Sequence, residues 1–524
     1  MLQRVELVLS PEEATHEEGF KKKLAQQIGI HETEIRDFRL AKRSIDARSR
    51  QVKFRLFFDV SLEGNLPPFL SAHRDYKNVS TKTPVLIIGA GPAGLFAALQ
   101  LIELGYKPIL IERGKDVRQR RRDLALINKH GEVNSNSNYC FGEGGAGTYS
   151  DGKLYTRSDK RGDVKRALET FVSFGATENI LIDAHPHIGT NKLPGIVTAM
   201  REHIEASGGE VHFNTILKSL KIVDNVIQGA IVSNVNQSET FLMEGKALIL
   251  ATGHSARDVF QLLNDQNILI EAKEFALGVR IEHPQALIDQ VQYHCETRSE
   301  FLPPAAYSFS GQYEGKGVYS FCMCPGGIIA PAATAPGEIV VNGWSPSKRN
   351  NPFANSGMVV SVQQEDLKKY IKHGALAAME YQSDVEKACY VAGGGKLVAP
   401  AQRMVDFCEG KFSSTLNETS YNPGVSSTQL KELLPESIVK SLQKGLIDFG
   451  KKMKGYYSNE AMIVATESRT SSPVRIPRDK ESCMHPQIQG LFPCAEGAGY
   501  AGGIISAAMD GERCAEASVR YLSR

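Results

Sequence analysis

The sequence predicts an α/β protein: a domain with a parallel sheet, an inserted α+β domain and a small N-terminal α+β domain. Three observations support this fold class. A strand, a Gly-rich turn, a helix and a second strand follow one another over residues 84–112. Strand-like segments of the same kind return at 210–213 and 247–251, and a Gly-rich turn leads into a small-residue helix after residue 491. The first 80 residues carry a separate pattern of strands and one helix.

Composition excludes several classes of protein. The chain has 524 residues, 61 Lys+Arg against 59 Asp+Glu, a net charge of +2 and 42% hydrophobic residues. This is typical of a globular protein of about two to four structural units. The near-neutral balance gives no electrostatic reason to expect binding to nucleic acid or to an anionic membrane. Nine cysteines without a CxxC pair argue against a disulfide framework and a zinc ribbon, and we expect no metal.

The sequence also carries no pattern of a membrane span or a secretory leader. The most hydrophobic stretch, 85–102, is broken by glycines and a proline, and the N-terminus has only a short apolar core before it turns acidic. We therefore expect a cytoplasmic protein that does not associate with a membrane.

Residues 1–80 form the predicted N-terminal module. Segments 4–9 and 51–60 alternate as strands, and 12–28 has helical spacing, so a βαββ arrangement fits. The module is rich in basic residues. A solvated face is the favoured interpretation, and a docking surface for an acidic protein or an RNA is the alternative. The residues are Lys21, Lys22, Lys23, Arg36, Arg39, Lys42, Arg43, Arg48 and Arg50.

The strongest motif is GAGPAG at 89–94, which follows a VLII strand and opens an Ala/Leu-rich helix. Gly89 permits a tight turn, Gly91 lets the backbone approach a pyrophosphate, and Gly94 allows close packing of helix on strand. The acidic residue expected about 20 positions later is Glu112, which can bind a ribose diol. This combination is typical of a Rossmann-like dinucleotide-binding domain.

NAD and FAD share this fingerprint, and three later segments favour FAD. ATG at 251–253 ends a strand in a small-residue turn, and GEGGAGTYSDGKL at 142–154 offers glycines for close approach. In the third segment Glu496 follows a strand, and Gly502-Gly503 lead into a helix near Ile504 whose N-terminus can stabilise charge on a reduced flavin. No second GxGxxG follows, so NAD(P)H is expected at most as a transient electron donor.

These segments resemble a poorly characterised family of FAD-dependent dehydrogenases with a glutathione-reductase-type flavin domain. The resemblance covers about residues 80–524 and also rests on GVRIEHP (278–284), FCMCPGG (321–327) and TSSPVRI (470–476). It implies noncovalent FAD, with Glu112 on the adenosine ribose and Glu496, where the family usually has Asp, near the ribityl chain. The predicted FAD contacts are Gly89, Ala90, Gly91, Pro92, Ala93, Gly94, Glu112, Arg113, Gly144, Gly145, Gly147, Thr148, Ser150, Leu217, Thr252, Gly253, Glu496, Gly502, Gly503 and Ile504.

The middle of the chain offers only weak candidates for catalysis. On a strand, Cys322 and Cys324 would share one face, as reactive thiols, as metal ligands or, in the favoured interpretation, as small buried side chains. The catalytic candidates are Cys324, Arg280, His283 and Lys153. We also expect one arginine of 118–122 to reach the FAD phosphates. Arg469 and Arg475 are expected either to bind an anionic substrate group or to form structural ion pairs.

These observations predict an FAD-dependent oxidoreductase that exchanges a hydride between flavin and a small organic substrate. Two alternatives remain: an RNA-modifying or RNA-binding flavoprotein that uses the basic module, and a flavin-binding sensor or structural protein without turnover. A protein partner could dock on the N-terminal module. The expected domains are an N-terminal module (1–80), a discontinuous FAD-binding domain (81–160, 205–275 and 460–524) and a substrate or cap domain (161–204 and 276–459).

Overall fold

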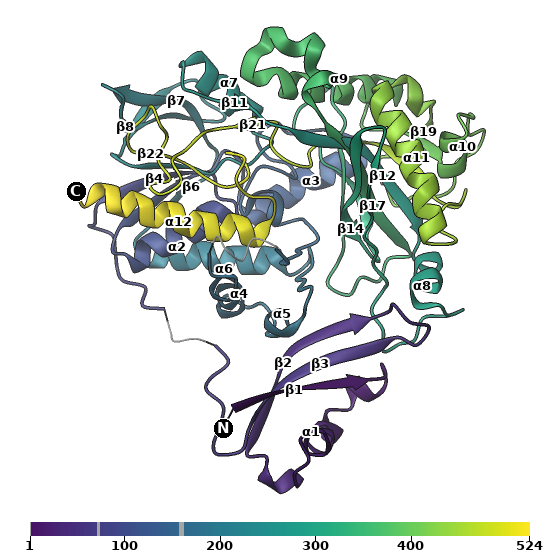
Figure 1. Cartoon of the computed structure of the whole chain (residues 1–524). Coiled ribbons are helices and arrows are strands. Elements are labelled where there is room, and N and C mark those ends of the chain that lie inside the picture. Colours follow the sequence, from purple (N-terminus) through teal and green to yellow (C-terminus); the bar gives the residue numbers. More distant parts are fainter. Residues whose placement is uncertain (1, 71–73, 157–161) are drawn as a thin grey trace.

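A computed structural model describes residues 2–70, 74–156 and 162–524. The N-terminal module forms a three-stranded antiparallel sheet of order β1-β3-β2, with one helix against it (Figure 1). Phe20 and Leu24 of the helix pack on Leu56 and Phe58 of the central strand. The predicted βαββ arrangement is confirmed, with elements β1 (Leu2–Leu9), α1 (Phe20–Ile28), β2 (Asp37–Asp46) and β3 (Lys53–Ser61).

The second domain is built on a five-stranded parallel sheet of order β22-β10-β4-β5-β6. The predicted parallel sheet is therefore present. Beside it lies a three-stranded antiparallel sheet of order β7-β8-β9. The strands are β4 (Pro84–Ile88), β5 (Lys107–Ile111), β6 (Glu210–His212), β7 (Thr215–Val223), β8 (Val226–Asn234), β9 (Thr240–Glu244), β10 (Leu248–Leu250) and β22 (Leu491–Pro493).

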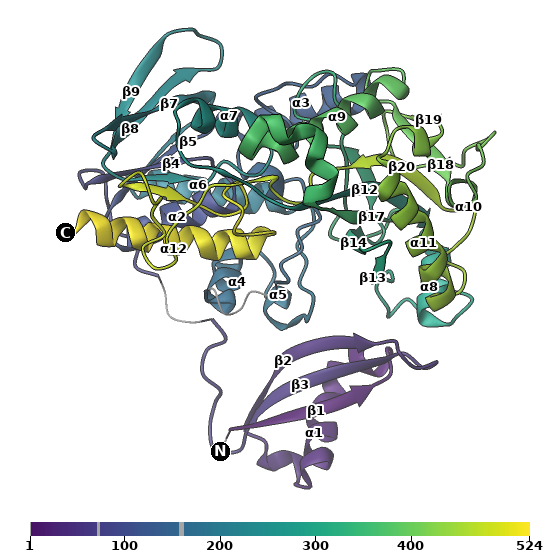
Figure 2. The same cartoon turned by 45° about the horizontal axis from the view of Figure 1, so that its top comes forward.

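The two faces of β4 bury alternate side chains against different layers. Val85 and Ile87 pack with α2 and α12, whereas Leu86 and Ile88 pack with the β7–β9 sheet and α7. Figure 2 shows α2 and α12 side by side along this domain. The helices are α2 (Pro92–Glu103), α3 (Val117–His130), α4 (Val164–Ser173), α5 (Asn179–Ile182), α6 (Leu193–Ala206), α7 (Arg257–Asp265) and α12 (Ile504–Leu522).

The cap is a mixed, mostly antiparallel seven-stranded sheet of order β13-β14-β17-β12-β20-β18-β19, which agrees with the predicted α+β insertion. Its strands are β12 (Phe275–Pro284), β13 (Ser310–Tyr313), β14 (Lys316–Cys324), β17 (Phe353–Val362), β18 (Ala399–Arg403), β19 (Val425–Ser427) and β20 (Met462–Glu467). Two small sheets pair β11 (Glu271–Ala272) with β21 (Val474–Arg475) and β15 (Ile328–Pro331) with β16 (Val341–Trp344). The helices are α8 (Gln285–Tyr293), α9 (Ala377–Ala392), α10 (Met404–Cys408) and α11 (Glu436–Lys452), and the 3₁₀ turns within Gln364–Leu376 are interrupted by a kink at Gly374.

Two expected domain boundaries differ from this packing. Helices α4 and α6, expected in the cap as part of 161–204, share a hydrophobic core with α2 and α12 instead. Strand β20, expected with the FAD-binding domain as part of 460–524, pairs with β12 and β18 of the cap. Every residue of β20 is buried, and a short apolar run of this kind does not reveal which of two sheets it joins.

Two further expectations concern helices and thiols. Within the described ranges, no helix is both long and apolar enough to cross a membrane. All nine cysteines lie within the described ranges, and each is a free thiol there.

Candidate functional site

The glycines of the first loop are required by contacts at two of its positions. Gly89 has φ +105°, and a Cβ there would lie 2.4 Å from the Ala251 carbonyl oxygen. A Cβ at Gly94 would lie 1.9 Å from the Gly89 oxygen. Gly91 differs, because a Cβ there would meet only the Gly145 Cα, at 3.9 Å. Gly91 is the N-cap of α2 and has no side-chain cap, so the first amides of this helix can serve an anion.

Glu112 joins three backbone segments. Its buried carboxylate accepts hydrogen bonds from the N–H groups of Ala90 (3.0 Å), Gly114 (2.8 Å) and Gly142 (2.9 Å). Oε2 accepts only the Ala90 bond of these three, and a carboxylate oxygen has room for another donor. The ribose contact implied by the family resemblance therefore remains a prediction that this geometry permits.

Arg120 organises the neighbouring loop, a role that sequence reasoning missed. Its fully buried guanidinium donates to the carbonyl oxygens of Asn138, Tyr139, Glu143 and Gly145, at 2.8–2.9 Å. Arg120 is therefore not the arginine that reaches the FAD phosphates, and for the exposed Arg118, Arg121 and Arg122 that contact stays a prediction. The available signal was helical spacing, since Arg120 lies on the face of α3 that also buries Leu124 and Ile127.

The 142–150 loop packs against the first turn of α2. The Gly144 N–H donates to the Ala90 oxygen at 2.8 Å, and a Cβ at Gly145 would lie 3.1 Å from the Gly91 Cα. A Cβ at Gly147 would approach Pro92 (3.0 Å) and Ile504 (3.7 Å). Three predicted segments thus meet at one place.

Two hydroxyls of this loop differ from expectation. Thr148, which is fully buried, donates to the Glu143 oxygen at 2.8 Å, and Ser150 donates to the Gly147 oxygen at 2.8 Å. Both protons are used inside the loop, so these side chains shape the loop instead of donating to a cofactor.

The remaining Gly-rich segments meet at the same edge of the sheet. A Cβ at Gly497 would lie 2.6 Å from the Gly253 oxygen, so the ATG and EGAG turns touch. The buried Thr252 Oγ1 has no hydrogen-bond partner among the described residues. Glu496 is partly exposed, with its Oε2 3.9 Å from His254 Nε2. Gly503 caps α12 without a side-chain cap, and a Cβ at Gly502 or Gly503 would meet no described atom within 4 Å.

These features fit an extended dinucleotide. The N-termini of α2 and α12 both begin at uncapped glycines, and the unpartnered Thr252 hydroxyl lies on the turn after β10 that contacts Gly89. Two predicted contacts fit less directly. Arg113 forms a bidentate pair with Asp258, both bonds 2.8 Å, and the Leu217 side chain is buried.

The structure brings three of the four catalytic candidates together. Lys153 Nζ lies 3.8 Å from Cys324 Sγ and donates to the Met323 oxygen, and Arg280 lies 3.6 Å from the same sulfur. Arg280 is fully buried and also pairs with Glu467 at 2.8 Å. Burial raises the pKa of the Cys324 thiol to about 11 despite the nearby Lys153, so Cys324 is not a ready thiolate nucleophile.

Two expectations for this region are wrong. His283 is fully buried, with Nε2 2.8 Å from the Tyr456 oxygen, and burial lowers its pKa to about 4, so it does not join the cluster. Cys322 and Cys324 do not share a face, because Cys322 is exposed and Cys324 is buried. A register shift of β14 against β17 between Phe321 and Cys324, with φ +44° at Cys322, breaks the strand alternation.

Three members of the polar cluster were missed by sequence reasoning. The buried Asp151 carboxylate lies 3.3 Å from Lys153, 3.5 Å from His187 Nε2 and 3.7 Å from Arg349. Burial opposes ionisation of Asp151, but Lys153, His187 and Arg349 outweigh it and hold its pKa below the usual range. We call Asp151, Lys153, His187 and Arg349 the junction cluster. No local pattern links His187 or Arg349 to residue 151.

Arg469 is a structural residue. It binds Glu338 at 2.6 Å and Glu386 at 3.1 Å, and Arg257 of α7 binds the same two carboxylates at 3.1 and 2.9 Å. These buried pairs connect the parallel-sheet domain to the cap. Of the two interpretations for Arg469, ion pairing is therefore the correct one. Arg475 is exposed and lies over the Tyr500 ring at 5.4 Å.

One group within the described part of the chain has metal-ligand spacing. Ligand atoms of Cys494, Asp510 and Cys514 lie within 4.8 Å of one another. Both Asp510 oxygens already bind Arg478, at 2.6 and 2.9 Å, and the same guanidinium lies 3.2 Å from Cys514 Sγ. A metal ion would compete with this fixed cation, so we assign no metal to the group.

Comparisons with known proteins identify the family and the cofactor. Residues 82–129 match a family model described as an FAD binding domain, and 274–470 match the C-terminal domain-like model of FAD-dependent proteins. The chain is also 40% identical over 517 residues to an uncharacterised protein of Clostridium beijerinckii, covering 95% of each chain. The chain belongs to this family of FAD-dependent proteins. Its cofactor is FAD, and the residues of the 89–94 loop lie within the matched FAD-binding segment.

One further family model and two solved structures also match the chain, but they say less about its function. Residues 1–61 match a domain of unknown function, DUF8436. The E. coli quinol fumarate reductase is 12% identical, with 84% of this chain and 70% of that chain covered and a TM-score of 0.36. A geranylgeranyl bacteriochlorophyll reductase-like protein of Thermoplasma acidophilum is 11% identical, with 84% and 79% covered and a TM-score of 0.34. At these TM-scores the likeness carries no conclusion about the flavoprotein described here.

Proposed function

We propose that this FAD-dependent protein is an oxidoreductase that exchanges a hydride between the flavin and a small organic substrate bound at the junction cluster. The observation that carries the proposal is the position of the cluster. Asp151 follows Gly147 by four residues, a span of at most about 14 Å in an extended chain. Gly147 itself packs against Pro92 and Ile504 at the N-termini of the two helices assigned to FAD.

The bound FAD would supply the hydride chemistry, and this chain's residues would supply binding and orientation. The N-termini of α2 and α12 would stabilise the phosphates and the negative charge of the reduced flavin. Lys153 and Arg349 are cations able to hold a polar substrate group. His187, beside Asp151, is a group of suitable chemistry to move a proton.

The test is an anaerobic reduction screen. Purified protein, reconstituted with FAD if needed, is mixed with single metabolites and with NADH or NADPH, and the flavin absorbance is followed. We expect bleaching by at least one small organic donor, with NAD(P)H as a transient donor in the reverse direction. A flavin that no organic compound reduces or reoxidises would contradict the proposal and favour a sensor or structural role.

A further inference from the structure

The N-terminal module is anchored to the chain segment that carries His187. The Arg43 side chain of β2 pairs with Asp183 at 2.7 Å. The Arg43 carbonyl oxygen accepts a hydrogen bond from the Ala184 N–H at 2.9 Å. This is a short parallel bridge between β2 and the residues that follow α5. Figures 1 and 2 both show the module beneath α5, with β2 as its nearest strand.

The other side of the same segment pairs with the loop that carries Asp151 and Lys153. The Leu154 N–H donates to the Pro186 oxygen at 3.0 Å, and the Ile188 N–H donates to the Gly152 oxygen at 3.1 Å. Lys153 and His187 form an antiparallel bridge between these hydrogen bonds. Residues 183–188 therefore connect the module directly to the junction cluster.

Positive charge gathers at this connection. Lys153 and Arg349 both lie beside the single Asp151 carboxylate. Lys42, next to Arg43 on β2, is exposed. Burial lowers the pKa of His185, and the positive charges of Lys42 and Arg349 lower it further. Two cations thus lie beside one carboxylate, and Lys42 adds a positive charge on the adjoining strand, whereas Arg43 is paired with Asp183.

The polar atoms of the cluster also have unused bonding capacity. Both Asp151 oxygens, His187 Nε2 and Arg349 Nε are buried without a hydrogen-bond partner among the described residues. Buried polar groups are nearly always hydrogen-bonded. The ion pairs of Asp151 are long, 3.3–3.7 Å, whereas the structural pair of Arg469 with Glu338 closes to 2.6 Å. This contrast favours a ligand-binding role for the cluster over a purely structural one.

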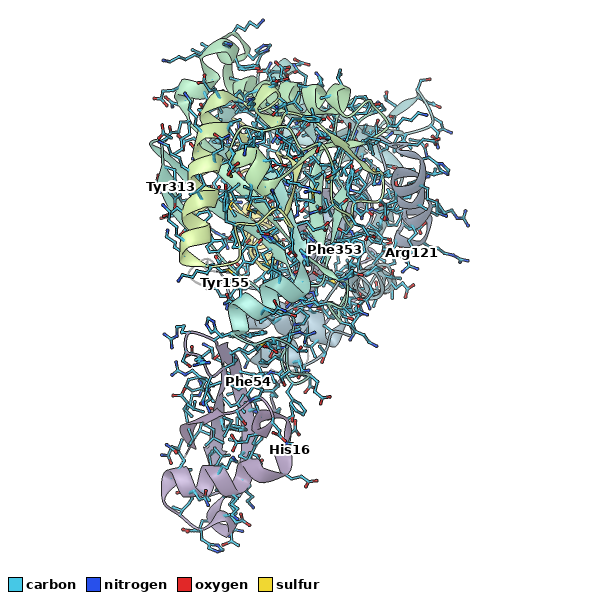
Figure 3. All side chains as sticks on the ribbon, turned by 90° about the vertical axis from the view of Figure 1, so that its right-hand side faces the viewer. His16, Phe54, Arg121, Tyr155, Tyr313 and Phe353 are labelled. Atoms are coloured by element: carbon cyan, nitrogen blue, oxygen red, sulfur yellow. The ribbon has the colours of Figure 1, made fainter. Side chains whose placement is uncertain are left out.

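Exposed side chains mark the outer end of the connection. Tyr155 is 52% exposed, and its ring centroid lies 4.9 Å from that of His185. In Figure 3, Tyr155 lies at the end of the main body nearest the N-terminal module. The side chain of Lys153 is 36% exposed, so solvent reaches the cluster.

We propose that the junction cluster binds a small oxyanion, a carboxylate or a phosphate group of the substrate, and that the N-terminal module forms one wall of this site through Lys42. Lys153 and Arg349 bind the anion, and Asp151 orients these two cations. This inference rests on the proposed function, because it names the substrate class for the same site. It also gives the N-terminal module a role within the enzyme.

The test is isothermal titration calorimetry of full-length, FAD-loaded protein with succinate and, separately, with inorganic phosphate. Binding of succinate alone identifies a carboxylate site, and binding of phosphate identifies a phosphate site. Lys153→Met should weaken binding about tenfold or more, since a hydrogen bond to a charged group contributes about 1.5–3 kcal/mol. Lys42→Glu should weaken it at least about threefold through Coulomb repulsion alone. The matched control is Lys22→Glu, an exposed position on α1, which lies on the side of the module's sheet away from the body, and it should change the affinity less than twofold.

Different results would contradict the anion site, the role of the N-terminal module and the proposed function. If neither ion binds the wild type, or if Lys153→Met and Arg349→Met both leave the affinity unchanged, the anion site is refuted. If Lys42→Glu behaves like Lys22→Glu, the module is not a wall of the site. FAD content and a melting curve are measured for every variant. Flavin that is present but never reducible contradicts the proposed function, whereas reducible flavin without anion binding contradicts only this inference.

Discussion

The guanidinium of Arg120 donates to the carbonyl oxygen of Gly145 at 2.8 Å, and Gly145 in turn packs against Gly91 at the start of α2. A buried cation on α3 therefore fixes the position of a loop that packs against the glycine turn predicted to bind FAD. Three further carbonyl bonds, to Asn138, Tyr139 and Glu143, hold the same loop.

Arg120→Met should lower both stability and FAD affinity, because four buried carbonyl groups lose their donor. We expect a loss of at least about 2 kcal/mol in the free energy of unfolding, measured by urea denaturation of the apoprotein. FAD affinity, measured by quenching of flavin fluorescence, should fall as well. The exposed Arg122→Met is the control and should change neither quantity. Unchanged FAD affinity in Arg120→Met would show that the loop does not border the cofactor.

Gly91→Val and Gly94→Val should fail in different ways. A Cβ at Gly91 meets only one atom, at 3.9 Å, so this variant should fold with a normal melting temperature and lose FAD. A Cβ at Gly94 would lie 1.9 Å from the Gly89 oxygen, so this variant should lose soluble folded protein. Circular dichroism melting and the flavin-to-protein absorbance ratio separate the two. Full flavin content in the Gly91→Val protein would contradict the prediction that the pyrophosphate binds at this loop.

Gly503→Val should alter the flavin without unfolding the protein. Gly503 has an extended backbone, with φ 176°, and a Cβ there meets no described atom within 4 Å. If the N-terminus of α12 stabilises the reduced flavin, a bulky side chain should lower the redox potential by on the order of 10–20 mV, the equivalent of one helix-dipole interaction. A redox titration alongside a melting curve measures both effects. A lower melting temperature with an unchanged potential would assign the turn to packing alone.

The Arg469→Met substitution should lower the free energy of unfolding most at neutral pH and least at acidic pH. Burial raises the pKa of Glu338, but the charges of Arg469 and Arg257 outweigh it and lower that pKa from 4.5 to about 2. Because the folded pKa is depressed, the contribution of Glu338 is present above pH 4.5 and is lost as pH falls toward 2. The shift corresponds to about 3 kcal/mol.

Unfolding free energies at pH 7, 4 and 3 measure this dependence. The free energy of unfolding of the wild type should fall as the pH decreases from 7 to 3. That of Arg469→Met should be lower at pH 7 and should change less with pH. The exposed Arg475→Met provides the control, with the pH dependence of the wild type. Parallel curves for the wild type and Arg469→Met would mean that Arg469 does not set the ionisation of Glu338.

The sequence alone determined the features that lie within short stretches of chain. The strand, glycine turn, helix and strand over 84–112 predicted the parallel sheet, since a βαβ unit needs contiguous residues and its glycines follow from local backbone sterics. The FAD assignment came from the same kind of local pattern, repeated at 142–154, 251–253 and 496–503. The alternating strands and single helix within residues 1–80 predicted the N-terminal module for the same reason.

Only the tertiary structure decided which distant residues meet. Asp151, His187 and Arg349 come from separate segments. Hydrogen bonds between 152–154 and 186–188 bring Asp151 and His187 together, and Arg349 reaches Asp151 from a third segment. The charges of Arg120 and Arg469 do not reveal whether they bind a ligand, a backbone carbonyl or a carboxylate, because a guanidinium suits all three. The membership of β20 in the cap has a similar reason, since a fully buried, mostly apolar strand fits any buried sheet and chain topology selects one.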